Sequence, residues 1–533
     1  MSTTSDREDI QYDLDLHDIQ GNLVKAYGRF RFSKTRYIFY RVHGEAKGRA
    51  FVRGLWEYIT TGEQWNPKQS QEKPSATTNM AFTYSGLKHL GVPQKSLQSF
   101  PSEFVMGMKA RRDILGDDGK SAPEHWDPIW QQEAPVDIWV SINGQSLEAV
   151  EERYQEICAV LSTCSGTDGV EQVKGHAGPN PDYQNASALY ENGRPTAKEH
   201  FGYTDGISDP YFKGSGRNER AVVGGGKPTR AAPNTREGWE PLETGEFILG
   251  YRDESQEYPF APIPRLLSFN GSFIVYRKLH ENVGSFNRYI DEVGKDFPGG
   301  KEMLMAKFAG RWANGAPLAL FPTQAEADEF AAKLANAQEQ RQTATGEEKV
   351  YWNEEYYKLR SQMVAFKYDE DLSGARCPIG SHIRRTNPRG ALEFGKEAFQ
   401  TPGALTDRRR LLRRGAPYGE VKDPTRDDGE HGIIFIAVGA SIKRQFEFVQ
   451  QQWINYSNDF KLGNDKDPLL GNHGEVEGQG TGRMTIEADP KGNRPPFFCA
   501  NLPRFVETRG GDYFFLPSLT ALWMIGAGTI DPT

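Results

Sequence analysis

The sequence ARCPIGSHIRRTNPR spans residues 375–389, and LLRRGAPYG follows at residues 411–419. Nine arginines lie between Arg376 and Arg414, although the whole chain carries a formal net charge of -8. One histidine, His382, stands among them between a glycine and a proline, and both of those residues disfavour a continuous helix. A run of arginines is often a solvated loop. The pattern also fits a histidine that serves as an axial ligand or a catalytic base beside an anionic group.

An upstream segment, HFGYTDGISDP at residues 200–210, places one carboxylate between glycines. Gly202 and Gly206 flank Asp205, and glycine lets a backbone pass close to a flat ligand. Asp205 would then be aimed at that ligand. Asp-Gly is also a common turn dipeptide, so this segment alone leaves an ordinary turn open.

Length and composition indicate a large, well-cored globular chain. The 533 residues exceed one ordinary core, so two domains or one duplicated unit are expected. Hydrophobic residues make up 37% and aromatic residues 12%. Acidic residues (72) outnumber basic ones (64), which argues against nucleic acid as a general partner.

The cysteines and apolar runs bear on the compartment. The four cysteines form no CxxC pair, which favours a reducing environment over a disulfide framework or a zinc site. The first residues show no apolar segment typical of a signal peptide, so a cytoplasmic location is expected. Residues 513–528 form the longest apolar stretch, which is shorter than the roughly twenty residues needed to span a bilayer. No membrane association is expected.

Strand-like and helix-like patterns alternate along the chain. A strand is predicted over residues 29–42, and three further strands each precede a predicted helix: 136–142 before 147–161, 272–279 before 283–293, and 432–438 before 441–454. Ser441 is a candidate N-cap. Polar helices are predicted over 323–341 and 352–364. The pattern indicates an α+β fold, with helices packed on antiparallel sheets.

These segments, in this order, resemble the dye-decolourising-type haem peroxidases. Residues 375–389 are similar to the axial-ligand motif, 411–419 to the segment with the distal arginine, and 202–206 to the Gly-x-x-Asp-Gly loop. The resemblance extends over most of the chain, from Asp18 to residues 501–517. Its length suggests a larger subgroup with insertions.

The resemblance implies two ferredoxin-like halves, with antiparallel sheets and helices packed around a haem pocket. Residues 1–215 would form the N-terminal half that carries the distal loop. Residues 216–265, rich in Gly, Pro and charge, would be the connection. Residues 266–533 would form the C-terminal half that binds haem, with an inserted helical segment near 323–364.

The resemblance also implies roles for individual residues. His382 would be the fifth iron ligand, and its second ring nitrogen would donate to Asp467. Asp205 would move a proton between the two oxygens of hydrogen peroxide. Arg413 would stabilise the oxygen that becomes anionic, with its neighbour Arg414 as an alternative.

Further residues would shape the pocket. Arg389 resembles the family's propionate-binding arginine, and Arg384 could assist it. Ile433 and Phe435 fall on one face of the 432–438 strand and would form an apolar roof. The family more often has Leu where this chain has Ile433, and Phe where it has Tyr203. Both departures would change the shape of the pocket and not the type of reaction.

The implied function is a peroxidase with one haem b per chain, which reduces hydrogen peroxide through a ferryl intermediate. Its reducing partners would be dyes, phenols or similar small aromatic one-electron donors. One alternative is a haem-binding or haem-handling protein on the same scaffold. A non-haem alternative is an arginine cluster that grips an anionic partner. Oligomeric state and manganese oxidation stay open.

Overall fold

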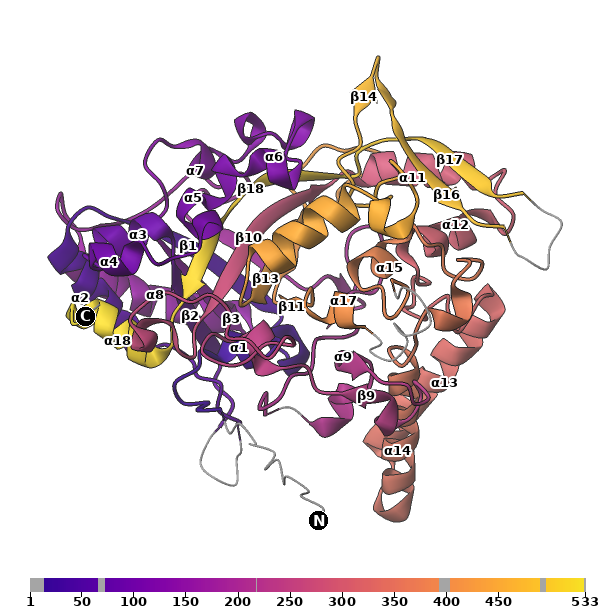
Figure 1. The fold of residues 1–533 in the computed structure, drawn as a ribbon, viewed down its shortest axis with the longest axis horizontal. Helices are drawn as coiled ribbons and strands as arrows, with labels where there is room; N and C mark the ends of the chain where they lie inside the picture. The colour runs from indigo at the N-terminus through magenta and orange to yellow at the C-terminus, as the bar shows by residue number, and fades with distance from the viewer. Residues whose placement is uncertain (1–13, 66–71, 217, 393–402, 489–494, 532–533) are drawn as a thin grey trace, which may run out of the picture.

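The computed structural model describes residues 14–65, 72–216, 218–392, 403–488 and 495–531. They form an α+β structure centred on one antiparallel sheet (Figure 1). Its strands lie in the order β11 (Leu412–Arg413), β13 (Gly432–Gly439), β10 (Ser272–Glu281), β18 (Val506–Leu516), β2 (Ala76–Phe82), β3 (Ile138–Gly144), β1 (Lys34–Val42) and β4 (Val170–Gln172), with β12 (Ala416–Tyr418) beside β13 and β5 (Gln184–Ser187) beside β1.

Helices surround the sheet. The longer ones are α2 (Glu45–Trp56), α5 (Ser102–Ala110), α8 (Leu147–Cys164), α11 (Val283–Val293), α12 (Gly300–Ala309), α13 (Gln324–Thr343), α14 (Gly346–Gln362) and α18 (Leu519–Ala527). Two short helices, α15 (His382–Thr386) and α17 (Ala404–Asp407), lie near β11 (Figure 1). Within the described ranges, no helix has the length and apolar content needed to cross a bilayer.

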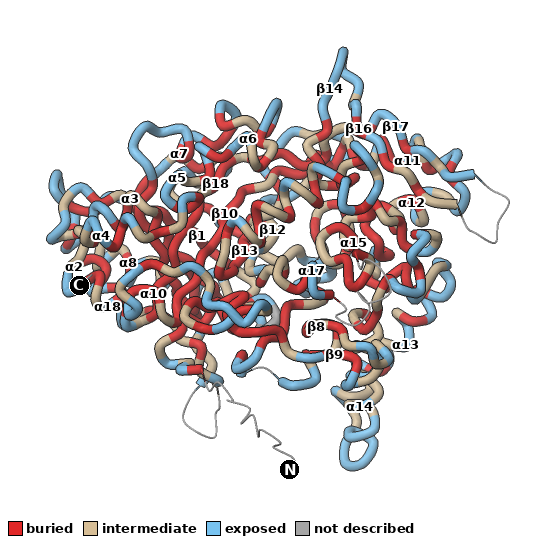
Figure 2. Tube along the Cα trace, viewed as in Figure 1, coloured by how far each residue is buried: buried red, intermediate tan, exposed pale blue. Residues whose placement is uncertain are grey.

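The sheet is the centre of the hydrophobic core (Figure 2). Every residue of β2 and β3 is buried, and so is all but one residue of β10. Removing this apolar and aromatic surface from water is the main favourable contribution to folding. The helical pair α13 and α14 lies outside this core, and α14 buries only Leu359. These two helices occupy the segment predicted as an insertion.

One sheet receives strands from both predicted halves. β1 to β5 come from the first 215 residues, whereas β10 to β13 and β18 come from residues after 265. The two sets meet where Phe82 of β2 pairs with Phe515 of β18. The division of the chain at residues 216–265 stays a prediction, since sheet pairing alone does not define domains.

Most predicted elements are present, and their ends have local causes. α11 covers the predicted residues 283–293. α8 begins at Leu147 because the Ser146 side chain accepts the N–H of Ala149. α13 begins after a capping box formed by Thr323 and Glu326.

Two predictions need correction. The strand predicted from residue 29 begins at Lys34, because Tyr27–Phe30 form a 3-10 turn and Arg31 is left-handed with φ 68°. The helix predicted over 441–454 is present, but its turns are π rather than α, over Lys443–Glu447 and Val449–Ile454. Ser441 Oγ accepts the N–H of Arg444 at 3.3 Å, as an N-cap would.

Candidate active site

Three segments far apart in sequence meet beside the β11–β13 edge of the sheet. They are the loop around Asp205, strand β11 with Arg413, and helix α15 with His382. In Figure 1, β11, α17 and α15 lie next to one another. The charges of Arg413 and Asp205 both act on the pKa of His382, so the three side chains lie within electrostatic reach of one another.

The Asp205 loop is shaped by its glycines and by backbone hydrogen bonds. Gly202 has φ 95° and Gly206 has φ 65°, and both values favour glycine. A Cβ placed at either glycine would meet no described atom within 4 Å, so both face open space. Asp205 N–H donates to Ala197 O at 2.7 Å, and Thr204 N–H donates to Ala313 O at 3.2 Å. The loop is therefore anchored while its glycines leave room for a flat ligand.

Asp205 and Arg413 form a direct pair. Arg413 Nη1 donates to Asp205 Oδ1 at 2.8 Å. Burial alone would raise the pKa of Asp205, but the charge of Arg413 and the N–H of Gly206 outweigh it and lower that pKa. The side chains of Arg413 and Asp205 remain 44% and 48% exposed, so the pair is reachable by a small reactant.

Arg414 belongs to a different contact. Its Nη1 donates to Asp209 at 3.1 Å, and its Nη2 donates to Leu23 O at 3.1 Å. Its side chain is buried. Adjacent residues of a strand point to opposite faces, which explains why Arg413 rather than Arg414 meets Asp205.

His382 is oriented by a buried carboxylate. Its Nδ1 lies 2.9 Å from Asp467 Oδ2, and the Asp467 side chain is fully buried. Asp467 Oδ1 accepts the N–H groups of Leu469 and Leu470, both at 2.9 Å. Burial would lower the pKa of His382, but the charge and hydrogen bond of Asp467 outweigh it and raise that pKa. The arrangement leaves Nε2 as the ring nitrogen available to a metal.

Arg385 is a supporting residue that the sequence analysis did not single out. It is fully buried and donates to Gly380 O at 2.8 Å, Trp453 O at 2.9 Å and Asp465 O at 3.0 Å. These bonds tie α15 to the segment that carries Asp467. Arg385 lies in the arginine-rich motif, but nothing in that motif distinguishes it from the neighbouring arginines.

Three buried arginines lie together and donate to backbone carbonyls. Arg389 donates to Val364 O, Arg311 to Met363 O, and Arg410 to Gly225 O, at 2.6, 2.8 and 3.1 Å. Burial and mutual repulsion lower the pKa of Arg389 to about 9, and burial lowers that of Arg311 to about 10. Arg311 is also within reach of the Arg413 charge. A cluster of this kind favours an anionic ligand. No sequence pattern singled out Arg311 or Arg410 for this role.

Arg384 does not share the partners of Arg389, Arg311 and Arg410. It is buried, and its guanidinium donates to Cys377 O at 2.7 Å and to Asp371 O at 2.9 Å. It also lies 4.5 Å from the centre of the Tyr368 ring. These contacts hold the loop that precedes His382.

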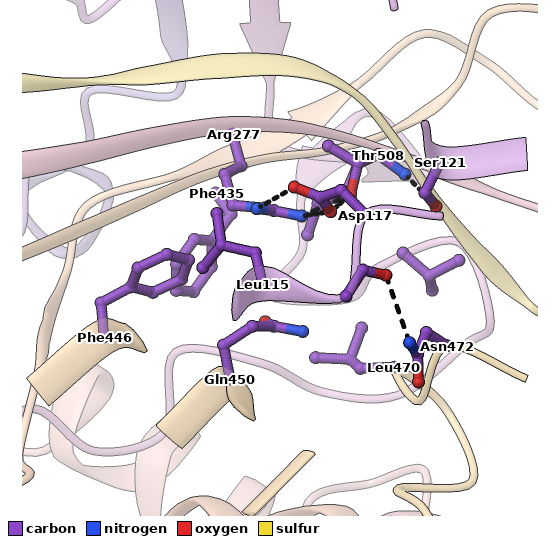
Figure 3. Close-up of a pocket in the computed structure, with 13 residues that line it drawn as sticks. Leu115, Asp117, Ser121, Arg277, Phe435, Phe446, Gln450, Leu470, Asn472 and Thr508 are labelled. Carbon is purple, nitrogen blue, oxygen red and sulfur yellow. Dashed lines mark hydrogen bonds and ion pairs between the residues drawn. The ribbon is translucent and has the colours of Figure 1, made fainter. Parts of the chain in front are cut away.

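Ile433 and Phe435 lie on one face of β13, opposite Leu279 and Arg277 of β10. Both are half-buried, whereas their neighbour Ile434 is fully buried. Phe435 packs against Phe446 with ring centroids 6.1 Å apart. Phe435 also lines a cavity of about 50 Å³, shown in Figure 3 together with the buried Arg277–Asp117 pair. Of the two predicted roof residues, Phe435 therefore borders open space.

The fold and the site together define a class of protein. A histidine held by a carboxylate, an arginine–aspartate pair within its electrostatic reach and a group of buried arginines suit an enzyme that binds an anionic, metal-containing cofactor.

Comparison with known proteins places the chain more narrowly. Residues 18–179 match the family described as "DyP dimeric alpha+beta barrel domain". The chain is 26% identical to the dye-decolorizing peroxidase msp1 of Mycetinis scorodonius, over 96% of this chain and 87% of that protein. It is 26% identical to the multifunctional dye peroxidase DyP2 of an Amycolatopsis species, over 95% of each chain. The solved structure of an ancestral D-type dye decolorizing peroxidase has 27% identity and a TM-score of 0.72, over 96% and 98% of the two chains.

Residues 18–179 therefore match that family's domain, and the chain as a whole is similar to dye-decolorizing peroxidases in sequence and fold.

Proposed function

We propose that this chain is a haem b peroxidase that reduces hydrogen peroxide and oxidises dyes, phenols or similar one-electron donors. The observation that carries the proposal is the meeting of two pairs, Arg413 with Asp205 and His382 with Asp467, within electrostatic reach of each other. The similarity to dye-decolorizing peroxidases supports the same activity.

The residues present fit haem. A porphyrin is flat and carries two propionates. Gly202 and Gly206 have positive φ and face open space, as a flat ligand near the Asp205 loop requires. Arg389, with Arg311 and Arg410 nearby, offers buried positive charge for a propionate. His382 offers a single oriented nitrogen. The proposed role of Arg384 is indirect, through the loop before His382.

Haem, when bound, supplies a redox-active iron with an open coordination position for peroxide. On the proximal side, His382 would present Nε2 to the metal. Asp467 accepts the Nδ1 proton, fixes the tautomer and increases the basicity of the ring. Arg385 keeps this pair aligned through its bonds to the backbone on both sides.

On the distal side, two residues divide the work of cleaving the O–O bond of peroxide. Asp205 is ionised at neutral pH because Arg413 lowers its pKa, so it can accept a proton from one peroxide oxygen and return it to the other. Arg413 donates hydrogen bonds to the oxygen that gains negative charge and stays charged itself. Ile433 and Phe435 would exclude water from this side.

The donor class follows from the family. One solved relative, 23% identical with a TM-score of 0.69, is a dye-decolorizing peroxidase in complex with 2,6-dimethoxyphenol. For this chain, small phenols and dyes are the donors we propose.

Haem loading followed by turnover tests the proposal. Protein purified after growth with a haem precursor should show a Soret band, and hydrogen peroxide with 2,6-dimethoxyphenol should give sustained turnover. Protein that shows a Soret band but only the turnover of free haem would instead be a haem-handling protein. Protein that takes up no haem would remove the proposal entirely.

A further inference from the structure

A pair of buried carboxyls lies directly behind the Asp205 loop. Glu199 and Glu281 are 8% and 3% exposed, and their carboxyls lie within hydrogen-bonding reach of each other. Two ionised carboxylates placed this way repel each other and have no proton to share. The arrangement therefore favours a proton on one of them.

The pair also holds the shape of the loop. Glu199 Oε2 accepts the N–H of Phe201 at 2.8 Å, and its Oε1 accepts the N–H of Tyr203 at 2.7 Å. The Glu281 carboxyl lies within reach of the His200 backbone. Backbone groups just before Asp205 are thus bonded to Glu199 and face Glu281. The charge of Asp205 is felt by both carboxyls.

The pKa shifts of Glu199 and Glu281 agree with one proton bound by the pair. Burial raises the pKa of Glu199 to about 7 and raises that of Glu281 well above its ordinary value. Two interacting carboxyls titrate as a unit, so the pair keeps a proton at neutral pH. The other titratable groups around it are Asp205, Tyr203 and His200 on the loop, His280 on β10, Tyr418 on β12, His431 and Glu430 before β13, and Glu507 on β18.

A row of histidines leads away from the pair. The His431 ring lies 5.5 Å from the ring of His200 and 5.1 Å from that of His280, between centroids. His431 is 1% exposed, and neither of its ring nitrogens has a hydrogen-bond partner of ordinary geometry among the described residues. Glu281 Oε2 is likewise buried without one in that part of the chain. Such orphaned polar atoms mark places for internal water.

His280, the outer end of the row, is buried beneath Asp427. His280 Nε2 lies 3.2 Å from Asp427 O, and the Asp427 side chain is partly exposed. Burial lowers the pKa of His431 to about 4 and also lowers that of His200. Both rings are therefore neutral at neutral pH. A neutral imidazole carries one N–H and one acceptor, so it can pass a proton on.

We propose that the Glu199–Glu281 pair is a proton store for the distal site, refilled from solvent along His280, His431 and His200. The proposal rests on the proposed function. Peroxide reduction consumes two protons and two electrons, H2O2 + 2 e⁻ + 2 H⁺ → 2 H2O, with the electrons supplied by two molecules of donor. In each transfer a proton leaves the carboxyl pair and reaches the Asp205 carboxylate through intervening water. A proton from solvent then restores the pair.

The test uses a variant that keeps the shape of the pair and removes its proton. In Glu281→Gln, the amide can still donate to Glu199, so the loop bonds to Phe201 and Tyr203 can persist. Glu507→Gln is the matched control: Glu507 is 4% exposed, neighbours the pair through Asn282 and is ion-paired with Arg509 at 2.6 Å. Ferrocyanide is the donor, because it gives electrons without releasing protons.

Haem content is measured first, then turnover in H2O and D2O between about pH 5 and about pH 8. Glu281→Gln should keep its haem, lose about tenfold in turnover, lose the ionisation near neutral pH and show a larger solvent isotope effect. Glu507→Gln should keep the wild-type profile. Infrared spectra of the wild type should show a protonated carboxyl C=O band that is missing in Glu281→Gln.

Three results would overturn the proton store. They are an unchanged pH profile and isotope effect in haem-loaded Glu281→Gln, a wild-type spectrum without the protonated-carboxyl band, or equal effects in Glu507→Gln. If Glu281→Gln does not fold, Glu199→Gln and the wild-type infrared spectrum decide in the same way. A wild type without haem or peroxide turnover would instead show that the proposed function has failed, and the infrared band would still report on the shared proton.

Discussion

At the scale of single residues, the candidate site depends on the direction in which each of several neighbouring arginine side chains points. The sequence contained the arginine and histidine motifs, and the family resemblance implied that His382, Asp467, Asp205 and Arg413 act together. The resemblance favoured Arg413 but left Arg414 open, because adjacent arginines are chemically alike and differ only in where their side chains point. The backbone contacts of Arg384, Arg389 and Arg311 depend on loops that no local pattern specifies.

The proximal pair gives the first prediction at this scale. His382→Ala should lose stably bound haem, because it removes the proposed protein–iron bond. Asp467→Asn should keep haem but bind it about 10- to 100-fold more weakly, since orienting partners of a metal ligand typically contribute that much. Haem transfer to apomyoglobin, followed by absorbance, measures both. A His382→Ala protein with a normal haem load and a histidine-ligated spectrum would place the ligand elsewhere.

Asp205 gives a prediction about pH. Its pKa is lowered in the folded protein, so its carboxylate is present from neutral pH down to below the ordinary aspartate range, and peroxide reactivity should fall only as the pH drops through that lowered pKa. Asp205→Asn should abolish this acidic limb and slow the reaction by about 10²–10⁴. The rate of the Soret change with peroxide, measured across acidic pH, checks this. An acidic limb that survives in the Asn variant would rule out Asp205 as the titrating base.

At the scale of elements, periodicity predicted most strands and helices, including α8, α11, α13 and β13. It missed the π turns after Ser441, because an α-helix and a π-helix present nearly the same apolar spacing over so short a segment. It also gave no strand order, since β10 pairs with β18, more than 200 residues away.

The half-buried face of β13 supports a prediction about access. Phe435→Ala should enlarge the cavity that Phe435 lines, while haem stays bound. The loss of stability should be below the roughly 3–5 kcal/mol typical of a fully buried phenylalanine, because Phe435 is only half-buried.

Michaelis constants for peroxide, 2,6-dimethoxyphenol and a bulky dye, together with denaturant unfolding, measure the effect. Phe435→Leu is the control, since it keeps most of the apolar volume. Kinetics identical to wild type with every oxidant and donor would remove Phe435 from the site.

At the scale of the whole molecule, one sheet links strands from both ends of the chain, and many charged groups are buried around it. Composition and length predicted a large core, but the buried ionisable groups are a product of tertiary packing. They make stability depend on pH. Burial raises the pKa of several carboxyls: Glu199, Glu246 and Glu487 to about 7, and Asp512 to about 6. Burial lowers the pKa of several histidines: His176 to about 3, and His431 and His473 to about 4.

The signs of these shifts predict a stability maximum slightly below neutral pH. A carboxyl with a raised pKa contributes stability that is present below its unfolded value and is lost as the pH rises through about 7. A histidine with a lowered pKa destabilises the fold only below its unfolded value of about 6.5. Thermal unfolding of the haem-loaded protein should therefore show a lower Tm at about pH 8 than at about pH 6.5. A Tm that rises over that interval would contradict these shifts.

The central claim is that this chain is a peroxidase whose Arg413 stabilises the charge that develops as peroxide is cleaved. The most direct measurement is stopped-flow absorbance of the Soret band after haem-loaded protein is mixed with hydrogen peroxide, for the wild type and for Arg413→Leu. The wild type should react rapidly. Arg413→Leu should keep its haem and react about 10²–10³-fold more slowly, because one preorganised donor is lost. Its acidic limb should move to higher pH, because Arg413 no longer lowers the pKa of Asp205. Equal rates in the two haem-loaded proteins, or a wild type whose Soret band does not respond to peroxide, would contradict the account.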